Sequence, residues 1–211
     1  MRILKISLTI FTLLFPTILL AEDNSSKEDK NRFDSGLFYS TWGIGIQNSY
    51  TSPNWEGVEY VASLAAGEKT NKIDGLGTSI KSQSNFQTFI LCPRFYLKEL
   101  GILDINGLFW QAGLSFRNWN GTGKILDDRT NAKIGSIKMK WSPLVFNAGI
   151  GWKKVWDYRF SFSVSINTTI GGSRTIEYTE NMSRFSDSLK TDLEEKTNYP
   201  TNMIIYFGYK Y

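Results

Sequence analysis

The most constraining feature of this sequence is the alternation of apolar and polar residues over residues 158–170, YRFSFSVSINTTI. Side chains of an extended strand point alternately to its two faces, so one face of this segment is apolar and the other is polar. Thr168 is the single interruption of the apolar face, which otherwise contains Tyr158, Phe160, Phe162, Val164, Ile166 and Ile170. The segment predicts a strand that lies between an apolar phase and a wet one.

The carboxyl terminus repeats this pattern. Every odd position of residues 203–211 is apolar or aromatic, up to the last residue: Met203, Ile205, Phe207, Tyr209 and Tyr211. The last strand of a water-soluble sheet usually frays into polar residues. A strand sealed against lipid has a reason to remain apolar to its end. The two segments together favour a membrane β-barrel.

The amino-terminal 21 residues have the layout of a secretory signal peptide. Arg2 and Lys5 give a basic start, residues 6–20 are apolar, and Ala21 is a small residue at the expected cleavage site. An uncleaved anchor helix is the alternative. We predict that residues 1–21 are removed on export. Residues 22–34 are charged and almost without apolar side chains, so we expect a disordered periplasmic leader there.

Six segments in all show the strand pattern clearly, the two above included, at residues 35–50, 86–97, 107–118, 142–154, 158–170 and 203–211. Residues 57–66 and 73–81 are ambiguous, because the first can also be written as a short helix. If both are strands, the total is eight. Short connections at 98–104 and 155–157 and long polar ones at 118–135 and 171–200 resemble the periplasmic turns and external loops of outer-membrane barrels. Both termini are then expected in the periplasm.

These features resemble the small bacterial outer-membrane β-barrel proteins of the OmpA/Opa-like kind. The resemblance implies an all-β fold, an antiparallel up-and-down transmembrane barrel over residues 35–211. It also implies that the terminal strand, with Met203, Ile205, Phe207, Tyr209 and Tyr211, is the signal read by the barrel-assembly machinery. A monomer in contact with outer-membrane lipid and lipopolysaccharide is expected. The aromatic content of 15 % fits the aromatic girdles of such barrels.

Catalysis and metal binding are disfavoured by composition. The sequence contains no histidine, so a Ser-His-Asp triad and a histidine-ligated metal site are excluded. We find no Asp or Glu within the clear strands, and the single cysteine, Cys92, is expected to be buried. No basic stripe with interleaved aromatic residues points to nucleic acid. We therefore expect no catalytic residues, cofactor or metal.

Two sets of residues are candidates for function. Polar positions on the inner faces of the predicted strands form the first set. They either form a cationic path for small anions or a rim that binds lipid phosphates, or they fill a narrow interior: Arg94, Gln111, Arg117, Asn147, Arg159, Asn167 and Lys210. The second is a predicted short extracellular helix at residues 183–197, whose apolar stripe has Phe185, Leu189 and Leu193. This stripe either closes over the barrel mouth or contacts an extracellular partner.

The sequence thus favours a non-enzymatic outer-membrane barrel with surface-exposed loops. A narrow pore or carrier for small solutes is the alternative, an enzyme acting on envelope lipids is less favoured, and a soluble β-sandwich or lipocalin-like carrier is the structural rival.

Overall fold

The structure is a computed structural model that describes residues 32–52, 55, 57–75, 77–156, 159–179 and 187–211. The predicted signal peptide, nearly all of the predicted leader, Tyr158 and Phe185 lie outside these residues. Among the described residues, no helix is both long enough and apolar enough to cross a membrane.

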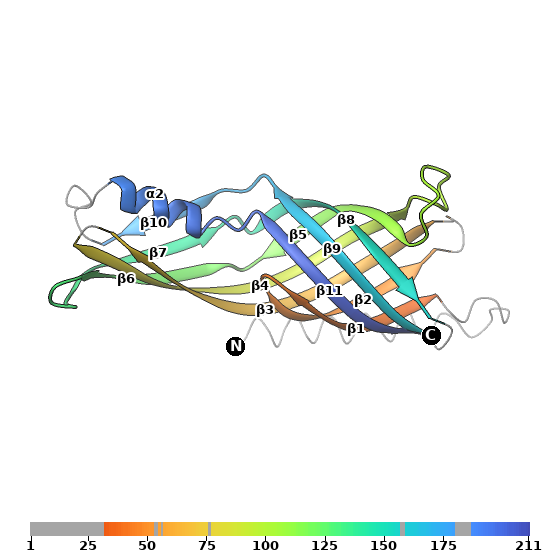
Figure 1. Ribbon diagram of the computed structural model, residues 1–211, viewed down its shortest axis with the longest axis horizontal. Coiled ribbons are helices and arrows are strands. Elements are labelled where there is room, and N and C mark those ends of the chain that lie inside the picture. The colour runs from red at the N-terminus through yellow and green to blue at the C-terminus, as the bar shows by residue number, and fades with distance from the viewer. Residues whose placement is uncertain (1–31, 53–54, 56, 76, 157–158, 180–186) are drawn as a thin grey trace.

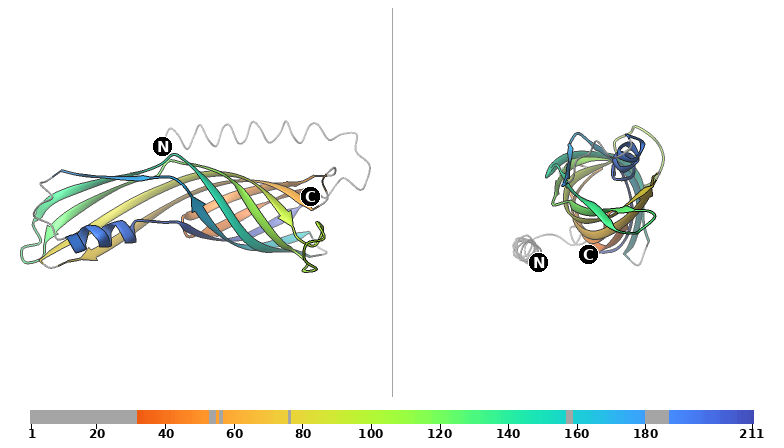
Figure 2. Two further views of the ribbon diagram at one scale, coloured as in Figure 1. Left: turned by 90° about the horizontal axis from the view of Figure 1, so that it is seen from above. Right: turned by 90° about the vertical axis from the view of Figure 1, so that its left-hand side faces the viewer.

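A closed ring of antiparallel strands forms the body of the molecule (Figure 1, Figure 2). Within the described residues the ring has eight strands: β1 (Phe33–Ser40), β2 (Gly43–Thr51), β3 (Val58–Asp74), β4 (Thr78–Tyr96), β5 (Leu108–Arg117), β8 (Leu144–Val155), β9 (Phe160–Ile170) and β11 (Thr201–Lys210). Each pairs with the next in this order, and β11 pairs with β1. The predicted antiparallel barrel is confirmed.

The prediction of a single strand over residues 35–50 is wrong. This segment is a hairpin, in which β1 and β2 are joined by Thr41 and Trp42, with Ser40 paired to Gly43. A two-residue connection reverses the parity of the outward positions, so Leu37 on β1 points outward beside Ile46 on β2. Phe38, predicted to share a face with Ile44, is consequently buried inside the barrel.

The ambiguous segments are parts of longer strands. Residues 57–66 lie mostly in β3, and residues 73–81 contain the end of β3 and the start of β4. β4 also includes most of the predicted strand 86–97. The number of ring strands is thus the expected one, but two of them are assigned differently. The first strand begins at Phe33, so Asp34 belongs to the barrel and not to the leader.

The outer surface of the ring is an apolar band. Every ring strand contributes at least one large apolar side chain that is exposed, among them Leu37, Ile44, Tyr60, Leu91, Trp110, Ile150, Ile166 and Phe207. Leu37, for example, is 63 % exposed. A continuous apolar surface of this extent is not stable in water. It is the surface expected for strands that contact acyl chains.

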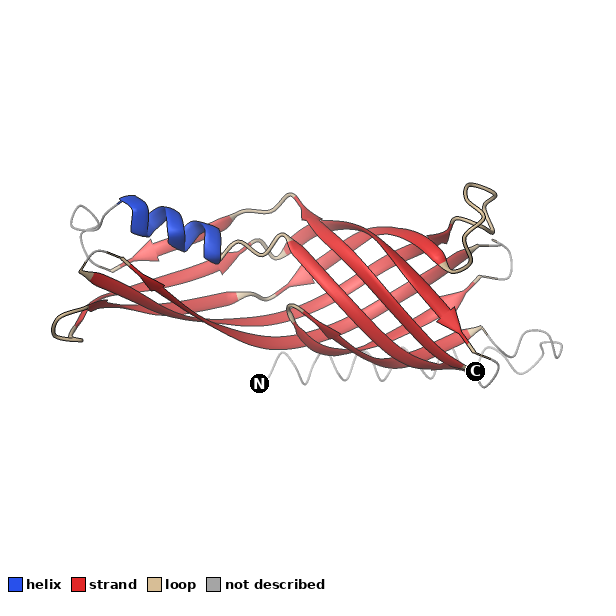
Figure 3. Cartoon of the chain, viewed as in Figure 1, coloured by secondary structure: helices blue, strands red, loops and turns tan. Residues whose placement is uncertain are grey.

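At the end of the barrel away from the start of β1 and the end of β11, the sheet continues as an extension (Figure 3). β3 and β4 run past the ring, and β4 then pairs with β6 (Asn120–Asp127), β6 with β7 (Lys133–Trp141) and β7 with β10 (Arg174–Tyr178). Residues 118–135, predicted to be a polar loop, are therefore mostly strand. Their polar side chains face solvent on one side of the sheet, and Ile125 faces the other.

Helix α2 (Asp187–Lys196) packs on the inner face of the extension. Leu189 and Leu193 are buried there against Ile73, Ile80 and Ile137. The predicted short helix is confirmed over Asp187–Lys196, and the predicted residues 183–186 lie outside the described residues. The hypothesis that its apolar stripe contacts an external partner is wrong for these two leucines, because the extension sheet already covers them.

Truncation of the helix contact tests this packing. Leu193 is fully buried, so Leu193→Ala is expected to destabilise the extension by about 2–5 kcal/mol. Faster amide exchange and faster proteolysis within α2 would report the loss, while the barrel keeps its protection. Glu195→Ala, an exposed change on the same helix, is the control. Unchanged exchange in Leu193→Ala would contradict the packing.

Candidate functional site

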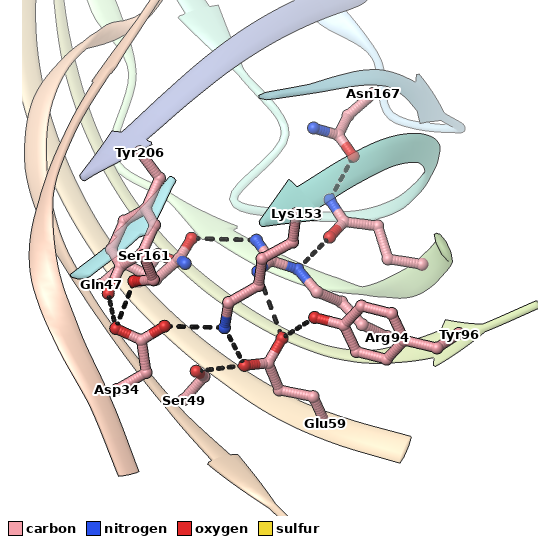
Figure 4. A network of polar contacts seen from close by, with 12 residues as sticks. Asp34, Gln47, Ser49, Glu59, Arg94, Tyr96, Lys153, Ser161, Asn167 and Tyr206 are labelled. Carbon is pink, nitrogen blue, oxygen red and sulfur yellow. Dashed lines mark hydrogen bonds and ion pairs between the residues drawn. The ribbon is translucent and has the colours of Figure 1, made fainter. Parts of the chain in front are cut away.

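Four charged side chains meet inside the barrel, at the end where β1 begins (Figure 4). Lys153 Nζ lies 2.7 Å from Asp34 Oδ2 and 2.5 Å from Glu59 Oε1, and Arg94 Nη1 lies 3.4 Å from Glu59 Oε2. All four are almost completely buried. They come from β1, β3, β4 and β8, so the ion pairs cross the lumen and join strands that are not all neighbours in the ring.

Neutral partners surround both carboxylates. Ser49 and Tyr96 donate hydrogen bonds to Glu59, at 2.6 and 2.8 Å. Ser161 and Tyr206 donate to Asp34 Oδ1, at 2.9 and 2.5 Å. A buried carboxylate loses its hydration, and these hydrogen bonds together with the ion pairs offset that cost. The two acidic and two basic groups balance in charge.

The network continues up the lumen through amide side chains. Arg94 donates through Nε to Gln111, at 2.8 Å, and through Nη2 to Gln47, at 3.1 Å. Gln111 in turn donates to Asn167. The cavity beside these groups has a volume of about 20 Å³, which leaves room for about one water molecule. The side chains therefore close this part of the barrel.

A cluster of aromatic residues lies beyond this network, where the ring meets the extension. It comprises Trp42, Phe86, Trp119, Trp141 and Tyr199, and Trp42 meets Trp119 edge to face with the ring centroids 4.8 Å apart. Between the two groups, Phe38, Ala65 and Ile204 pack inside the barrel, as does buried Cys92 with Val61 and Ile90. Buried side chains thus occupy the lumen at the network, at the mouth and between the two.

The structure brings four of the predicted inner polar residues together inside the lumen: Arg94, Gln111, Asn147 and Asn167. Asn147 accepts a hydrogen bond from Thr169 at 3.2 Å. Arg117 lies at the mouth of the barrel, and Lys210 is half-buried at the opposite end. The prediction that Arg159 faces the lumen is wrong. It is exposed, with a positive φ of 64°, in the turn that precedes β9, because the alternation of the strand does not extend to it.

Sequence reasoning missed three of the four central charges. Asp34 was assigned to the charged leader, and Lys153 lies beside Lys154 at a strand end, where charged residues are usually solvated. Glu59 lies in the ambiguous segment, yet its position was recoverable. Tyr60, Ala62 and Leu64 point outward, so Glu59 must point inward. The clear segments contain no Asp or Glu, but the barrel does contain carboxylates, because Asp34 and Glu59 lie in strands that extend beyond those segments.

Each carboxylate of this site contacts a cation. The cavity beside Arg94 and Gln111 has a volume of only about 20 Å³. Within the described part of the chain, no group of three or more potential metal ligands is present. The arrangement joins strands across the interior.

The sequence matches no protein-family model and no curated protein. Among solved structures, CarO of Acinetobacter baumannii is similar, with a TM-score of 0.58 and 10 % identity over 88 % of this chain and 100 % of that one. CarO2 of the same organism has a TM-score of 0.57 and 12 % identity, over 86 % of this chain and 99 % of that one. The fold is that of the small bacterial outer-membrane β-barrels. At these identities the likeness extends to the fold alone. Ail, the attachment invasion locus protein of Yersinia pestis, is also similar, with a TM-score of 0.38, 12 % identity and coverage of 86 % of this chain and 97 % of that one.

Removal of one charge tests the network. Glu59→Gln keeps the shape of the side chain but leaves Arg94 without its carboxylate and Lys153 with only Asp34. We expect the free energy of unfolding in lipid vesicles, measured by urea titration, to fall by about 3–5 kcal/mol. Glu68→Gln on the exposed part of the same strand is the control and should change it by less than about 1 kcal/mol. Adding Lys153→Met to Glu59→Gln should recover part of the loss. Equal losses in the two single variants would contradict the role of the network.

Proposed function

We propose that the protein is a non-enzymatic integral protein of the bacterial outer membrane, in which a closed barrel anchors a folded extension outside the cell. The observation that carries this proposal is the filled lumen, with its charge-balanced network of Asp34, Glu59, Arg94 and Lys153. The extension leaves the barrel at the end opposite to the start of β1 and the end of β11, so a periplasmic location of these two strand ends places it at the cell surface (Figure 1).

The packing of the interior argues against the pore alternative. An eight-stranded barrel is only just wide enough for its own side chains, and here the cavity beside Arg94 and Gln111 has a volume of about 20 Å³. A permeating ion would have to displace buried ion pairs and the aromatic residues at the mouth. The proposed anchor therefore holds no continuous aqueous path.

Recordings of conductance in planar bilayers distinguish the closed anchor from the pore alternative. The purified protein, shown to be folded by its heat-modifiable mobility in detergent gels, is expected to give no steady single-channel events in planar bilayers. A general porin inserted under the same conditions is the control for detection. Steady openings of the folded protein would favour the pore alternative and refute the closed anchor.

An enzymatic role is disfavoured by the available side chains. The sequence contains no histidine to act as a general base near neutral pH, and Cys92 is buried inside the barrel. Mass spectrometry of lipid A after overexpression tests this part of the proposal. An unchanged mass spectrum agrees with it, and a new lipid A species that depends on the protein would overturn it.

Lipopolysaccharide is the partner that the extension suits best. Lys72 on β3, Lys81 on β4 and Lys124 on β6 are successive cross-strand partners on its outer face. Like charges opposite each other destabilise a sheet, and a bound anion relieves this repulsion. Asp74 contacts Lys72 at 2.8 Å and raises its pKa, whereas no carboxylate among the described residues pairs with the other two. A groove of about 480 Å³ runs beside Lys81, Lys124 and Lys138.

Substitution of these lysines tests the assignment. A lysine near an anionic surface contributes about 1 kcal/mol, so the variant Lys81→Gln/Lys124→Gln/Lys138→Gln is expected to bind lipopolysaccharide at least about tenfold more weakly. Co-sedimentation with lipopolysaccharide vesicles at low salt measures this. The control Lys98→Gln/Lys154→Gln/Arg159→Gln removes the same charge at the opposite end of the barrel. Equal losses in the two variants would show a general charge effect and refute the site.

A further inference from the structure

A second cavity lies at the barrel mouth, on the side where β9 ends. Its walls come from segments far apart in the sequence: the end of β5, the end of β7, residues 169–174 and residues 198–200. Arg117, Trp119, Trp141, Arg174 and Tyr199 line it, and its volume is about 80 Å³. A water molecule occupies about 30 Å³ in the liquid, so the cavity has room for a few waters or one small ligand.

Arg117 has no anionic partner in this cavity. Its side chain is 8 % exposed, and no carboxylate among the described residues lies within ion-pair distance of it. The guanidinium carbon lies 4.2 Å from the ring centroid of Trp119, so one face of the group is stacked on the indole. The donors of a guanidinium lie in its plane and point away from its edges. Stacking therefore leaves these edges available, and the buried Nε has no hydrogen-bond partner.

Arg174 brings a second positive charge to the same cavity. Its Nη1 donates to the Glu194 carbonyl, at 2.8 Å, and to the Thr197 hydroxyl, at 2.6 Å, which fixes the side chain against the end of α2. Its Nε is buried and also has no partner. Burial lowers the pKa of this guanidinium, and Glu194 acts in the opposite direction. The group remains charged at neutral pH because an arginine pKa is so high.

Trp141 supplies a third unpaired donor. Its indole Nε1 is buried without a hydrogen-bond partner, and its ring stacks with that of Tyr199 at a centroid distance of 6.2 Å. Most buried polar groups in folded proteins are paired, so three unpaired donors around one cavity need a physical reason. Arg117 is a buried positive charge without a carboxylate partner, and the half-buried Arg174 lines the same cavity. A bound anion would offset the cost of desolvating these charges.

We propose that this cavity is a binding site for a small oxyanion, such as a phosphate, sulfate or carboxylate group, held by Arg117, Arg174 and Trp141. The oxygens of such a group accept hydrogen bonds only, which matches the unpaired donors. A metal cation is repelled by the two guanidinium groups. An apolar ligand leaves all three donors unpaired. This assignment goes beyond the anchoring role and does not depend on a closed lumen.

Isothermal titration calorimetry with inorganic phosphate or acetate tests the site. The full-length protein is folded in a non-ionic detergent, and ionic strength is held constant with chloride. We expect saturable binding of at least one of the two anions. A hydrogen bond to a charged group contributes enough for Arg117→Gln and Arg174→Gln each to weaken binding about ten- to a hundredfold. Trp141→Phe keeps the ring but removes the donor, so a loss of about two- to tenfold is expected.

Two controls make the outcome decisive. Heat-modifiable mobility confirms that each variant is folded, and Trp141→Phe supplies the test if an arginine variant does not fold. Lys124→Gln removes a positive charge from the outer face of the extension and should leave binding unchanged. The absence of saturable binding, equal affinities in wild type and all folded site variants, or an equal loss in Lys124→Gln would each overturn the site.

The same titration distinguishes two sources of the anion. In nanodiscs that contain lipopolysaccharide, a lipid phosphate in the cavity would raise the apparent dissociation constant for inorganic phosphate above its value in phosphatidylcholine nanodiscs. An unchanged constant would show that the site takes a free anion. Either result supports an oxyanion site and identifies its occupant.

Discussion

The structure depends on the closure of one hydrogen-bonded ring. In the hydrocarbon region of a membrane no water can satisfy backbone N–H and C=O groups, so a sheet with open edges is not stable there. The pairing of β11 with β1 removes the last open edges of the barrel. The strands can place their outward apolar side chains in lipid only because ring closure pairs their backbone N–H and C=O groups. The polar side chains are then left in a narrow interior, where they must satisfy one another.

The sequence predicted the parts of the fold that follow from local alternation. The strands β5, β8, β9 and β11 point the expected residues outward, such as Trp110, Ile150, Ile166 and Phe207. Each of these strands can be recognised from its own sequence. Lipid on one side and a packed interior on the other impose an alternation of apolar and polar residues with a period of two. Closure into a barrel then follows from the need to satisfy the backbone, and not from any single residue.

The remaining features depend on contacts between distant segments, which alternation does not report. The β1–β2 hairpin reverses its outward parity at Thr41–Trp42, and a single parity over residues 35–50 therefore misplaced Phe38. The extension was taken for a loop because its outer face is as polar as a loop. At the site, Arg94 was predicted but its partners Glu59 and Lys153 were not, since an ion pair between β3, β4 and β8 becomes visible only when the ring is closed.

The pairing of β3 with β4 has a mechanical consequence. Its register is unbroken from Val58–Phe95, inside the barrel, to Asp74–Ser79, at the tip of the extension. Eight residues of β3 lie beyond Ala66, a length of roughly 25 Å at about 3.3 Å per residue. The tip of the extension is therefore held by a rigid pair of strands and not by a flexible linker. A peptide epitope grafted between these two strands would be displayed at a nearly constant distance from the barrel.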